Sequence, residues 1–234
     1  MRHAHGRGQG ERVKFEAVIF DMDGLLLDSE RPIRDAWVEV GRELGVVLEV
    51  ATYQRVIGRT MKEVHAILGE VFGVEAYQRA ASRVADMLEA RHAARGYAAK
   101  AGAHDLLRWL GGIEVACGLA SSSHRDKVER RLAQAQLLDF FDALAAGDEV
   151  THGKPAPDVY LLAAERLGVD PRACLAFEDS ENGARAALAA GMQVILVPDL
   201  VQPGEEVAAQ CMLLSSLEGA PELCGEWFGR RRTV

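Results

Sequence analysis

The sequence predicts an α/β fold in which a doubly wound parallel sheet carries an inserted all-helical domain. Three observations lead to this prediction. Short apolar runs without polar alternation, typical of strands buried on both faces, recur along the chain. Stretches with helical periodicity separate the later runs, as expected for a parallel sheet covered by helices. One long segment, residues 30–96, holds several amphipathic stretches and no convincing strand.

Five apolar runs are expected to form the strands. The first, 17–20, is a short buried-type run that ends in two aspartates and a glycine. The others lie much later in the chain, at 115–120 (VACGLA), 143–146, 174–177 (CLAF) and 194–197 (VILV).

End signals mark the helices between these strands. The helices over 159–167 and 182–190 are expected to stop at Gly168 and Gly191, because glycine readily adopts the left-handed conformation of a C-terminal cap. Ser123 is expected to be the N-cap of the helix that follows it.

The inserted segment is expected to contain helices at 33–44, 60–72 and 76–92. It leaves the sheet after the first strand and returns near Gly96 and Tyr97, so the two crossings should lie side by side and act as hinges. The predicted division is a core of residues 13–29 and 97–234, a helical domain of residues 30–96, and a flexible tail of residues 1–12.

Composition indicates a soluble globular protein. The 35 acidic residues exceed the 27 basic ones, and a net charge of −8 disfavours nucleic acid and anionic membranes as partners. No apolar run has the length to span a bilayer, and the polar first residues lack the apolar segment of a secretory signal. The four cysteines, without a CxxC pair, are expected to be buried free thiols. A cytoplasmic monomer is therefore expected.

Polar residues follow the predicted strands at their carboxyl ends. In order along the chain they are Asp21, Asp23, residues 121–123 (SSS), Lys154, Glu178 and Asp179. Because the carboxyl ends of parallel strands share one edge of a sheet, these side chains should converge on one crevice. The carboxylates of Asp21 and Asp179 would there form an oxygen-rich site suited to Mg²⁺.

A phosphate group fits the remaining polar residues. Ser121 offers a hydroxyl donor, the helix after Ser123 offers backbone N–H groups, and Lys154 offers a cation. A metal, a cation and hydrogen-bond donors are what phosphoryl transfer requires, because its catalysis is mainly positioning and charge neutralisation.

Four motifs in this order, FDMDG, LASSS, GKPAP and FEDS, resemble those of the haloacid dehalogenase superfamily. The resemblance extends over residues 15–217 and is to the subgroup that contains β-phosphoglucomutase and many small-metabolite phosphatases. It implies a Rossmann-like core, and it implies that the helical insertion is a cap domain. Since four motifs occur in order, the resemblance is specific.

The resemblance implies a role for each motif residue. Asp21 would be the nucleophile that forms an aspartyl-phosphate, and Asp23 would be the general acid and then the general base. Mg²⁺ would be held by Asp21, Asp179 and the backbone carbonyl of Asp23. Glu178 would support these ligands from behind. The phosphate would be bound by Ser121, Ser122 and Lys154.

Other functions of these residues fit the sequence less well. A calcium loop would need glycine where Leu26 stands, and a Walker A loop would need Ser or Thr where Pro155 stands. No G-x-S-x-G surrounds Ser121, which disfavours a serine hydrolase. Helix capping remains open for the three serines, because capping and phosphate binding use the same geometry.

Substrate choice is expected to depend on the cap. In the stretch IGRTMKEV, Arg59, Thr60 and Lys62 are candidates for specificity, although a solvated helix start explains them equally well. Met61 stands where the resemblance places the phosphate-binding arginine of the mutase, so hydrolysis of a sugar phosphate or nucleoside monophosphate is favoured over a phosphosugar mutase. A noncatalytic phosphate-binding protein is the third hypothesis.

Overall fold

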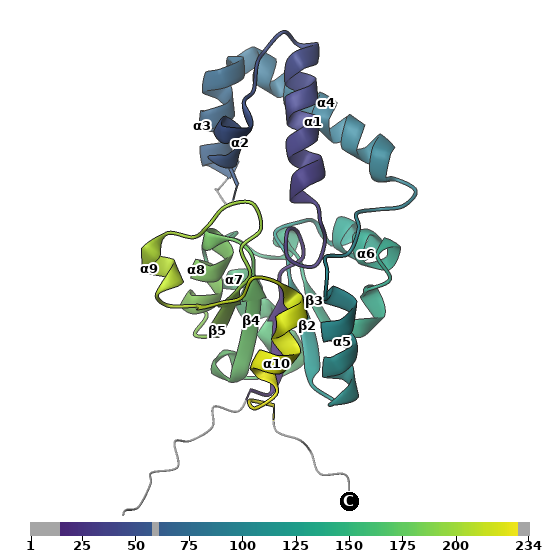
Figure 1. The fold of residues 1–234 in the computed structure, drawn as a ribbon, viewed down its shortest axis with the longest axis vertical. Coiled ribbons are helices and arrows are strands. Elements are labelled where there is room, and N and C mark those ends of the chain that lie inside the picture. The colour runs from purple at the N-terminus through teal and green to yellow at the C-terminus, as the bar shows by residue number, and fades with distance from the viewer. Residues whose placement is uncertain (1–14, 58–60, 229–234) are drawn as a thin grey trace, which may run out of the picture.

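The computed structural model describes residues 15–57 and 61–228, so the predicted tail and the cap candidates Arg59 and Thr60 lie outside it. The described chain forms a six-stranded parallel sheet in the order β3-β2-β1-β4-β5-β6 (Figure 1). The strands are β1 (Ala17–Phe20), β2 (Ala116–Ala120), β3 (Ala143–Ala145), β4 (Cys174–Glu178), β5 (Gln193–Leu196) and β6 (Met212–Leu213). The predicted fold class is confirmed.

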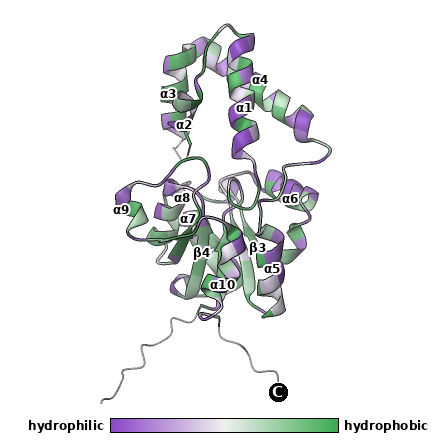
Figure 2. Ribbon diagram, viewed as in Figure 1, coloured by the Kyte–Doolittle hydropathy of each residue, from purple (hydrophilic) through white to green (hydrophobic). Residues whose placement is uncertain are grey.

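Helices cover both faces of the sheet. One apolar core contains Val18 and Phe20 of β1 and residues of α5 (Ala103–Gly112), α6 (Arg125–Gln134) and α10 (Ala220–Cys224). The other contains Ala17 and Ile19 and residues of α7 (Asp158–Leu167), α8 (Glu181–Ala189) and α9 (Glu205–Ala208). Because successive side chains of β1 point to opposite faces and both faces are covered, the strand is apolar throughout. Strand β4, which is labelled in Figure 2, likewise shows mainly the colour of hydrophobic residues. Short 3₁₀ helices complete the core: η1 (Leu138–Phe140), η2 (Gly147–Glu149), η3 (Pro171–Ala173) and η4 (Leu217–Gly219).

The register of the central strands aligns their carboxyl ends. Phe20 of β1 lies opposite Leu119 of β2 on one side and opposite Phe177 of β4 on the other. The chain runs outward from β1 through β2 to β3, and later returns to place β4 against the other side of β1. Such a reversal leaves a crevice at the carboxyl ends of the strands, where ligands bind in open α/β sheets.

The described part of the insertion is entirely helical. It comprises α1 (Glu30–Glu43), α2 (Val50–Gln54), α3 (Met61–Phe72) and α4 (Val74–His92), which lie together beyond the carboxyl edge of the sheet (Figure 1). These helices have a core of their own, in which Trp37 stacks on Tyr77 with ring centroids 5.8 Å apart. The insertion therefore buries apolar surface independently of the sheet.

The two crossings between the sheet and the insertion lie side by side, as predicted. The Asp28 N–H donates to the Ala98 carbonyl, and the Lys100 N–H donates to the Leu26 carbonyl, both at 2.8 Å. Asp199 joins the crossings further, because its carboxylate accepts from Lys100 at 2.6 Å and from Arg31 at 2.8 Å. Their action as hinges stays a prediction.

The predicted N-cap of α6 is wrong. The helix begins at Arg125 with His124 in the capping position, and the His124 side chain makes no capping hydrogen bond. The Arg125 N–H donates instead to Asp148 Oδ1 at 2.9 Å. The Ser123 hydroxyl instead donates to Asp23 at 3.1 Å, so it serves the crevice rather than the helix end. Gly168, by contrast, caps α7 in the left-handed conformation as predicted.

Two further predictions concern the cysteines and the absence of a membrane-spanning segment. All four cysteines are free, and Cys211 is only partly buried whereas the other three are buried. Within residues 15–57 and 61–228, none of the helices combines the length and apolarity needed to cross a membrane.

Candidate functional site

A buried ion pair lies at the end of the central strand. Asp21 follows β1, and the Lys154 ammonium donates to its Oδ1 at 2.5 Å. The same ammonium donates to Glu178 Oε1 at 2.6 Å. The side chain of Asp21 is 10% exposed, that of Lys154 is 8% exposed, and that of Glu178 is fully buried. The structure thus brings together residues from three separate motifs.

Glu178 anchors this pair through both of its oxygens. Its Oε1 also accepts from the Tyr160 hydroxyl at 2.8 Å, and its Oε2 accepts from the Asp179 N–H at 3.0 Å. Gly183 provides the space, because a Cβ there would lie 1.7 Å from Glu178 Oε1. Sequence reasoning missed Tyr160 and Gly183. Glu178 therefore holds Lys154 in place, consistent with a supporting carboxylate.

The Asp179 carboxylate is placed to bind a cation together with its acidic neighbours. One ligand atom each from Asp21, Glu178 and Asp179 lies within 4.8 Å of the others. Among the described residues, no group donates a hydrogen bond to the Asp179 carboxylate, although the residue is only 9% exposed. A buried carboxylate without a donor is costly unless a cation approaches it, so the donor set fits a hard divalent cation.

The buried groups of this cluster carry more negative than positive charge. Burial raises the pKa of Asp21 to about 8 against the opposing charge of Lys154. Burial, followed by the charges of Glu178 and Asp21, also raises the pKa of Asp179 well above its usual range. Burial opposes the charged form of Glu178 as well, but Lys154 outweighs it and lowers the pKa of Glu178. One lysine cannot neutralise three carboxylates, and a further cation would.

Asp23 is held at both carboxylate oxygens. Arg131 of α6 donates to Oδ1 at 2.8 Å, and the Ser123 hydroxyl donates to Oδ2 at 3.1 Å. Ser121 lies beside them, 1% exposed, with its Oγ accepting from the Ser123 N–H at 3.1 Å. Sequence reasoning missed Arg131, because it belongs to no motif and lies 108 residues from Asp23.

Most of the predicted site residues line one cavity of about 200 Å³. Its lining includes the predicted residues Asp21, Asp23, Ser121, Ser122, Lys154 and Asp179. A second cavity, of about 500 Å³, adjoins it and shares Ile57, Asp179, Ser180 and Asn182 with its wall. The larger cavity lies between α2 of the insertion and the loops of the sheet edge. Together the cavities offer a small polar pocket that opens into a wider space.

Glu30, at the start of α1, is a further acidic residue of the smaller cavity that sequence reasoning missed. Burial and the nearby carboxylates of Asp23 and Asp199 raise the pKa of Glu30 to about 7. It adds to the negative potential around Asp23.

The wall of the larger cavity on the insertion side includes Gln54, Arg55 and Ile57. Sequence reasoning missed Gln54 and Arg55, since neither stands in a recognisable pattern. Lys62 is exposed and is not among the described residues that line either cavity. A role for Lys62 in specificity stays a prediction.

Replacing Gly24 by alanine should disturb the carboxylate cluster. Gly24 has φ +88°, and a Cβ there would lie 2.1 Å from Asp179 Oδ2. Backbone strain and this clash together should lower the free energy of unfolding by about 1–3 kcal/mol and displace Asp179. Gly45→Ala is the matched control, because Gly45 has φ +73° and no heavy atom within 4 Å of the added Cβ. Urea unfolding should show a clearly larger loss for Gly24→Ala, and equal losses would contradict the clash.

Comparison with known proteins places the chain in a family. The haloacid dehalogenase-like hydrolase model matches residues 15–191. A probable pseudouridine-5'-phosphatase of Drosophila melanogaster is 37% identical over 209 residues, covering 85% of this chain and 88% of the relative. Fructose-1-phosphate phosphatase YqaB of Escherichia coli is 34% identical over 187 residues, covering 78% of this chain and 96% of the relative.

A solved structure supports the same assignment at the level of the fold. β-Phosphoglucomutase from Clostridium difficile superposes with a TM-score of 0.70 at 23% identity, covering 91% of this chain and 97% of that one. Its likeness includes the helical insertion as well as the sheet, given that coverage. The chain therefore belongs to the haloacid dehalogenase-like hydrolase family, and its relatives assign it to the phosphoric monoester hydrolases.

Proposed function

We propose that this protein is a Mg²⁺-dependent phosphatase that hydrolyses a small phosphomonoester through an aspartyl-phosphate. The observation that carries the proposal is the cluster of Asp21, Lys154 and Asp179 at the carboxyl end of β1. In this cluster the buried Lys154 ammonium donates a hydrogen bond to the Asp21 carboxylate. The Asp179 carboxylate lies beside it and accepts no hydrogen bond from the described residues. This arrangement supplies a nucleophile and the charges that phosphoryl transfer requires.

In the first step a carboxylate oxygen of Asp21 attacks phosphorus, and the bond from phosphorus to the ester oxygen breaks. Asp23 gives its proton to the departing oxygen. In the second step Asp23 takes a proton from the water that attacks phosphorus, the bond between phosphorus and the Asp21 oxygen breaks, and inorganic phosphate leaves. Ser121, Ser122 and Lys154 bind the phosphoryl oxygens. Both aspartates line the same cavity, which supports this division of roles.

Mg²⁺ would be held by Asp21, Asp179 and the backbone carbonyl of Asp23, with Glu178 supporting Lys154. When bound, it neutralises charge on the phosphoryl group during transfer. The close carboxylates and the raised pKa values of Asp21 and Asp179 support such a site.

We propose a sugar phosphate or a nucleoside monophosphate as the substrate. The larger cavity would receive the alcohol portion of the ester, and Gln54, Arg55 and Asn182 offer hydrogen bonds to hydroxyl groups there. The named relatives, which act on pseudouridine 5'-phosphate and fructose 1-phosphate, support this substrate class. Residues 30–96 would be the cap that closes over the core of residues 13–29 and 97–234, in a cytoplasmic monomer.

The proposal is tested by measuring inorganic phosphate released from sugar phosphates and nucleoside monophosphates, with Mg²⁺ and with EDTA. Release from a few esters that depends on Mg²⁺ is the expected result. Isomerisation of a hexose phosphate without release would indicate a mutase. Tight phosphate binding without either reaction would indicate a noncatalytic binding protein.

Stabilisation by Mg²⁺ should grow with pH. Burial raises the pKa of Asp21 from 3.8 to about 8, so the folded metal-free protein holds this proton more tightly than the unfolded chain. The metal-free protein should lose stability as pH rises between these values, whereas Mg²⁺ binds the deprotonated carboxylates and should restore it. At a hundredfold excess over Kd, Mg²⁺ should raise Tm by roughly 5–10 °C.

Thermal unfolding in EDTA and in Mg²⁺, at about pH 6 and about pH 8.5, measures this effect. Distant titrating groups affect Tm equally in both solutions at a given pH, so their contribution cancels when the Tm in EDTA is subtracted from the Tm in Mg²⁺. It should be larger at the higher pH and should shrink in Asp179→Asn. A shift independent of pH, or one retained in the variant, would contradict the assigned ligands.

A further inference from the structure

We propose that Arg131 is a positioning residue for Asp23. It holds the Asp23 carboxylate and at the same time packs against the segment that returns from the cap to the sheet. The inference rests on the proposed function, in which Asp23 protonates the leaving oxygen. Arg131 Nη1 lies 2.8 Å from Asp23 Oδ1, and the two side chains are 19% and 24% exposed. A partly buried ion pair is held more firmly than one in open solvent.

Arg131 fixes an aspartate that its surroundings would otherwise displace. Asp21 and Glu30 line the same cavity as Asp23, so three carboxyl groups face one small space. The Ser123 hydroxyl holds only one carboxylate oxygen. Without Arg131 the other oxygen has no donor among the described residues, and repulsion from the neighbouring carboxylates would favour rotation away from the ester.

Arg131 is itself fixed by an aromatic ring. Its guanidinium lies 5.0 Å from the centre of the Tyr97 ring, a distance that suits a cation–π contact. Tyr97 is 5% exposed and stacks on His92, the last residue of α4, with ring centroids 4.2 Å apart. Because Tyr97 belongs to the return crossing of the cap, the arginine that holds Asp23 rests on the crossing itself.

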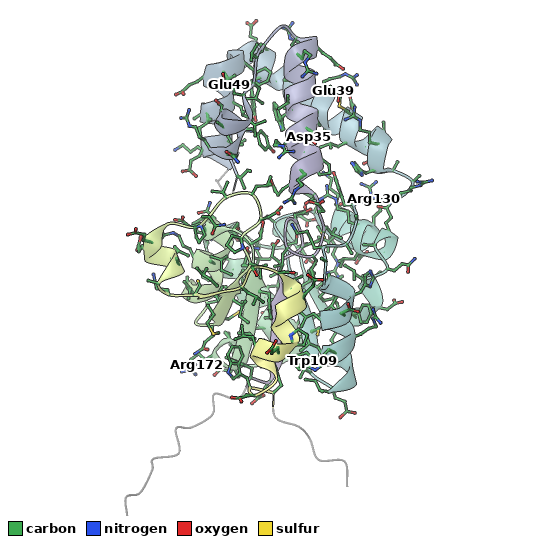
Figure 3. The ribbon with its side chains drawn as sticks, in the orientation of Figure 1. Asp35, Glu39, Glu49, Trp109, Arg130 and Arg172 are labelled. Atoms are coloured by element: carbon green, nitrogen blue, oxygen red, sulfur yellow. The ribbon has the colours of Figure 1, made fainter. Side chains whose placement is uncertain are left out.

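Neighbouring residues of α6 hold the end of α4 in the same region. Arg130 donates to both carboxylate oxygens of Glu89, at 2.8 and 3.1 Å, and Figure 3 places it between α6 and the end of α4. Gln134 donates to the Ala93 carbonyl at 2.7 Å. Helix α6 therefore contacts both the acid and the end of α4, and Arg131 itself contacts Asp23 and Tyr97 of the return crossing.

A positioning role predicts a loss that depends on the leaving group. Alkyl phosphates need a proton on the departing oxygen, whereas p-nitrophenyl phosphate releases a stable anion and needs none. The parameter kcat/KM reports the steps up to departure of the alcohol, so it isolates the acid role of Asp23. A merely structural role of Arg131 would lower kcat/KM for both classes of ester alike.

The experiment compares kcat/KM of the full chain for p-nitrophenyl phosphate with that for fructose 1-phosphate, ribose 5-phosphate and uridine monophosphate. Arg131→Gln should lose about 10- to 100-fold on the alkyl esters and less than about threefold on p-nitrophenyl phosphate. Arg131→Lys, which retains a charge, should recover most of the loss. Arg130→Ala, which removes the neighbouring ion pair with Glu89, should leave the ratio between esters unchanged.

Each outcome decides between the inference and the proposed function. Equal losses of Arg131→Gln and Arg131→Lys on both classes of ester would overturn the positioning role while the phosphatase stands. A change of the ratio in Arg130→Ala as large as in Arg131→Gln would also overturn it, because the effect would then belong to α6 as a whole. Absence of hydrolysis of every ester by the wild type would overturn the proposed function and the inference with it.

Discussion

An Asp21→Asn variant is expected to release phosphate from the preferred ester at less than about one ten-thousandth of the wild-type rate. The amide cannot attack phosphorus, so the covalent route is lost even though the side chain keeps its size. Folding should survive, since the neutral amide replaces a buried carboxylate whose pKa is raised to about 8 by burial. A colorimetric assay of inorganic phosphate measures the rate, and thermal unfolding verifies the fold.

Asp35→Asn is the matched control for this variant. Asp35 lies on α1 (Figure 3), and its side chain is 62% exposed, so the same chemical change there should leave the rate unaltered. Appreciable turnover by Asp21→Asn would show that water attacks the ester directly and that Asp21 only holds the metal.

A Lys154→Met variant is expected to lose both activity and stability. Lys154 is 8% exposed and contacts the carboxylates of Asp21 and Glu178, which its removal would leave without their cation. Breaking one partner of a buried ion pair costs about 3–5 kcal/mol. The rate of phosphate release should fall at least about 100-fold, because the variant lacks the positive charge that holds Asp21 and would bind the phosphate.

The stability loss should depend on pH in a defined direction. Without Lys154 the pKa of Glu178, which Lys154 now lowers, should rise, so protonation at low pH would relieve the repulsion. Urea unfolding should therefore show a larger loss at about pH 8 than at about pH 5.5. Lys127→Met, at an exposed position of α6, is the control. A variant as stable as the wild type at both pH values would contradict the assigned pair.

The elements that the sequence predicted are those with a strong local pattern. The strands β1 and β4 are buried on both faces, so they appear as continuous apolar runs. Helix α2 has five residues, and β6 has two residues that are both at least partly exposed. Segments this short cannot show a repeating pattern of apolar and polar residues, so the sequence does not reveal them. Their formation depends on neighbours that only the folded chain supplies.

The motif residues could be placed from the sequence because each follows a strand of known direction. Arg131 and Tyr160 could not, because they reach the site from helices α6 and α7, and the packing of those helices fixes their partners. The failed prediction for Ser123 has the same origin. Its hydroxyl could serve a helix end or a carboxylate, and only the approach of Asp23 decides between them.

The phosphorylated state of Asp21 tests the central claim most directly. Wild-type enzyme mixed with excess substrate and Mg²⁺, quenched in acid within milliseconds and digested, should yield the peptide containing Asp21 with the added mass of one phosphoryl group. The modification should disappear as phosphate is released, and Asp23→Asn should retain it longer, because the base for its hydrolysis is missing. Rapid phosphate release with an unmodified Asp21 peptide at every time point would contradict the covalent mechanism.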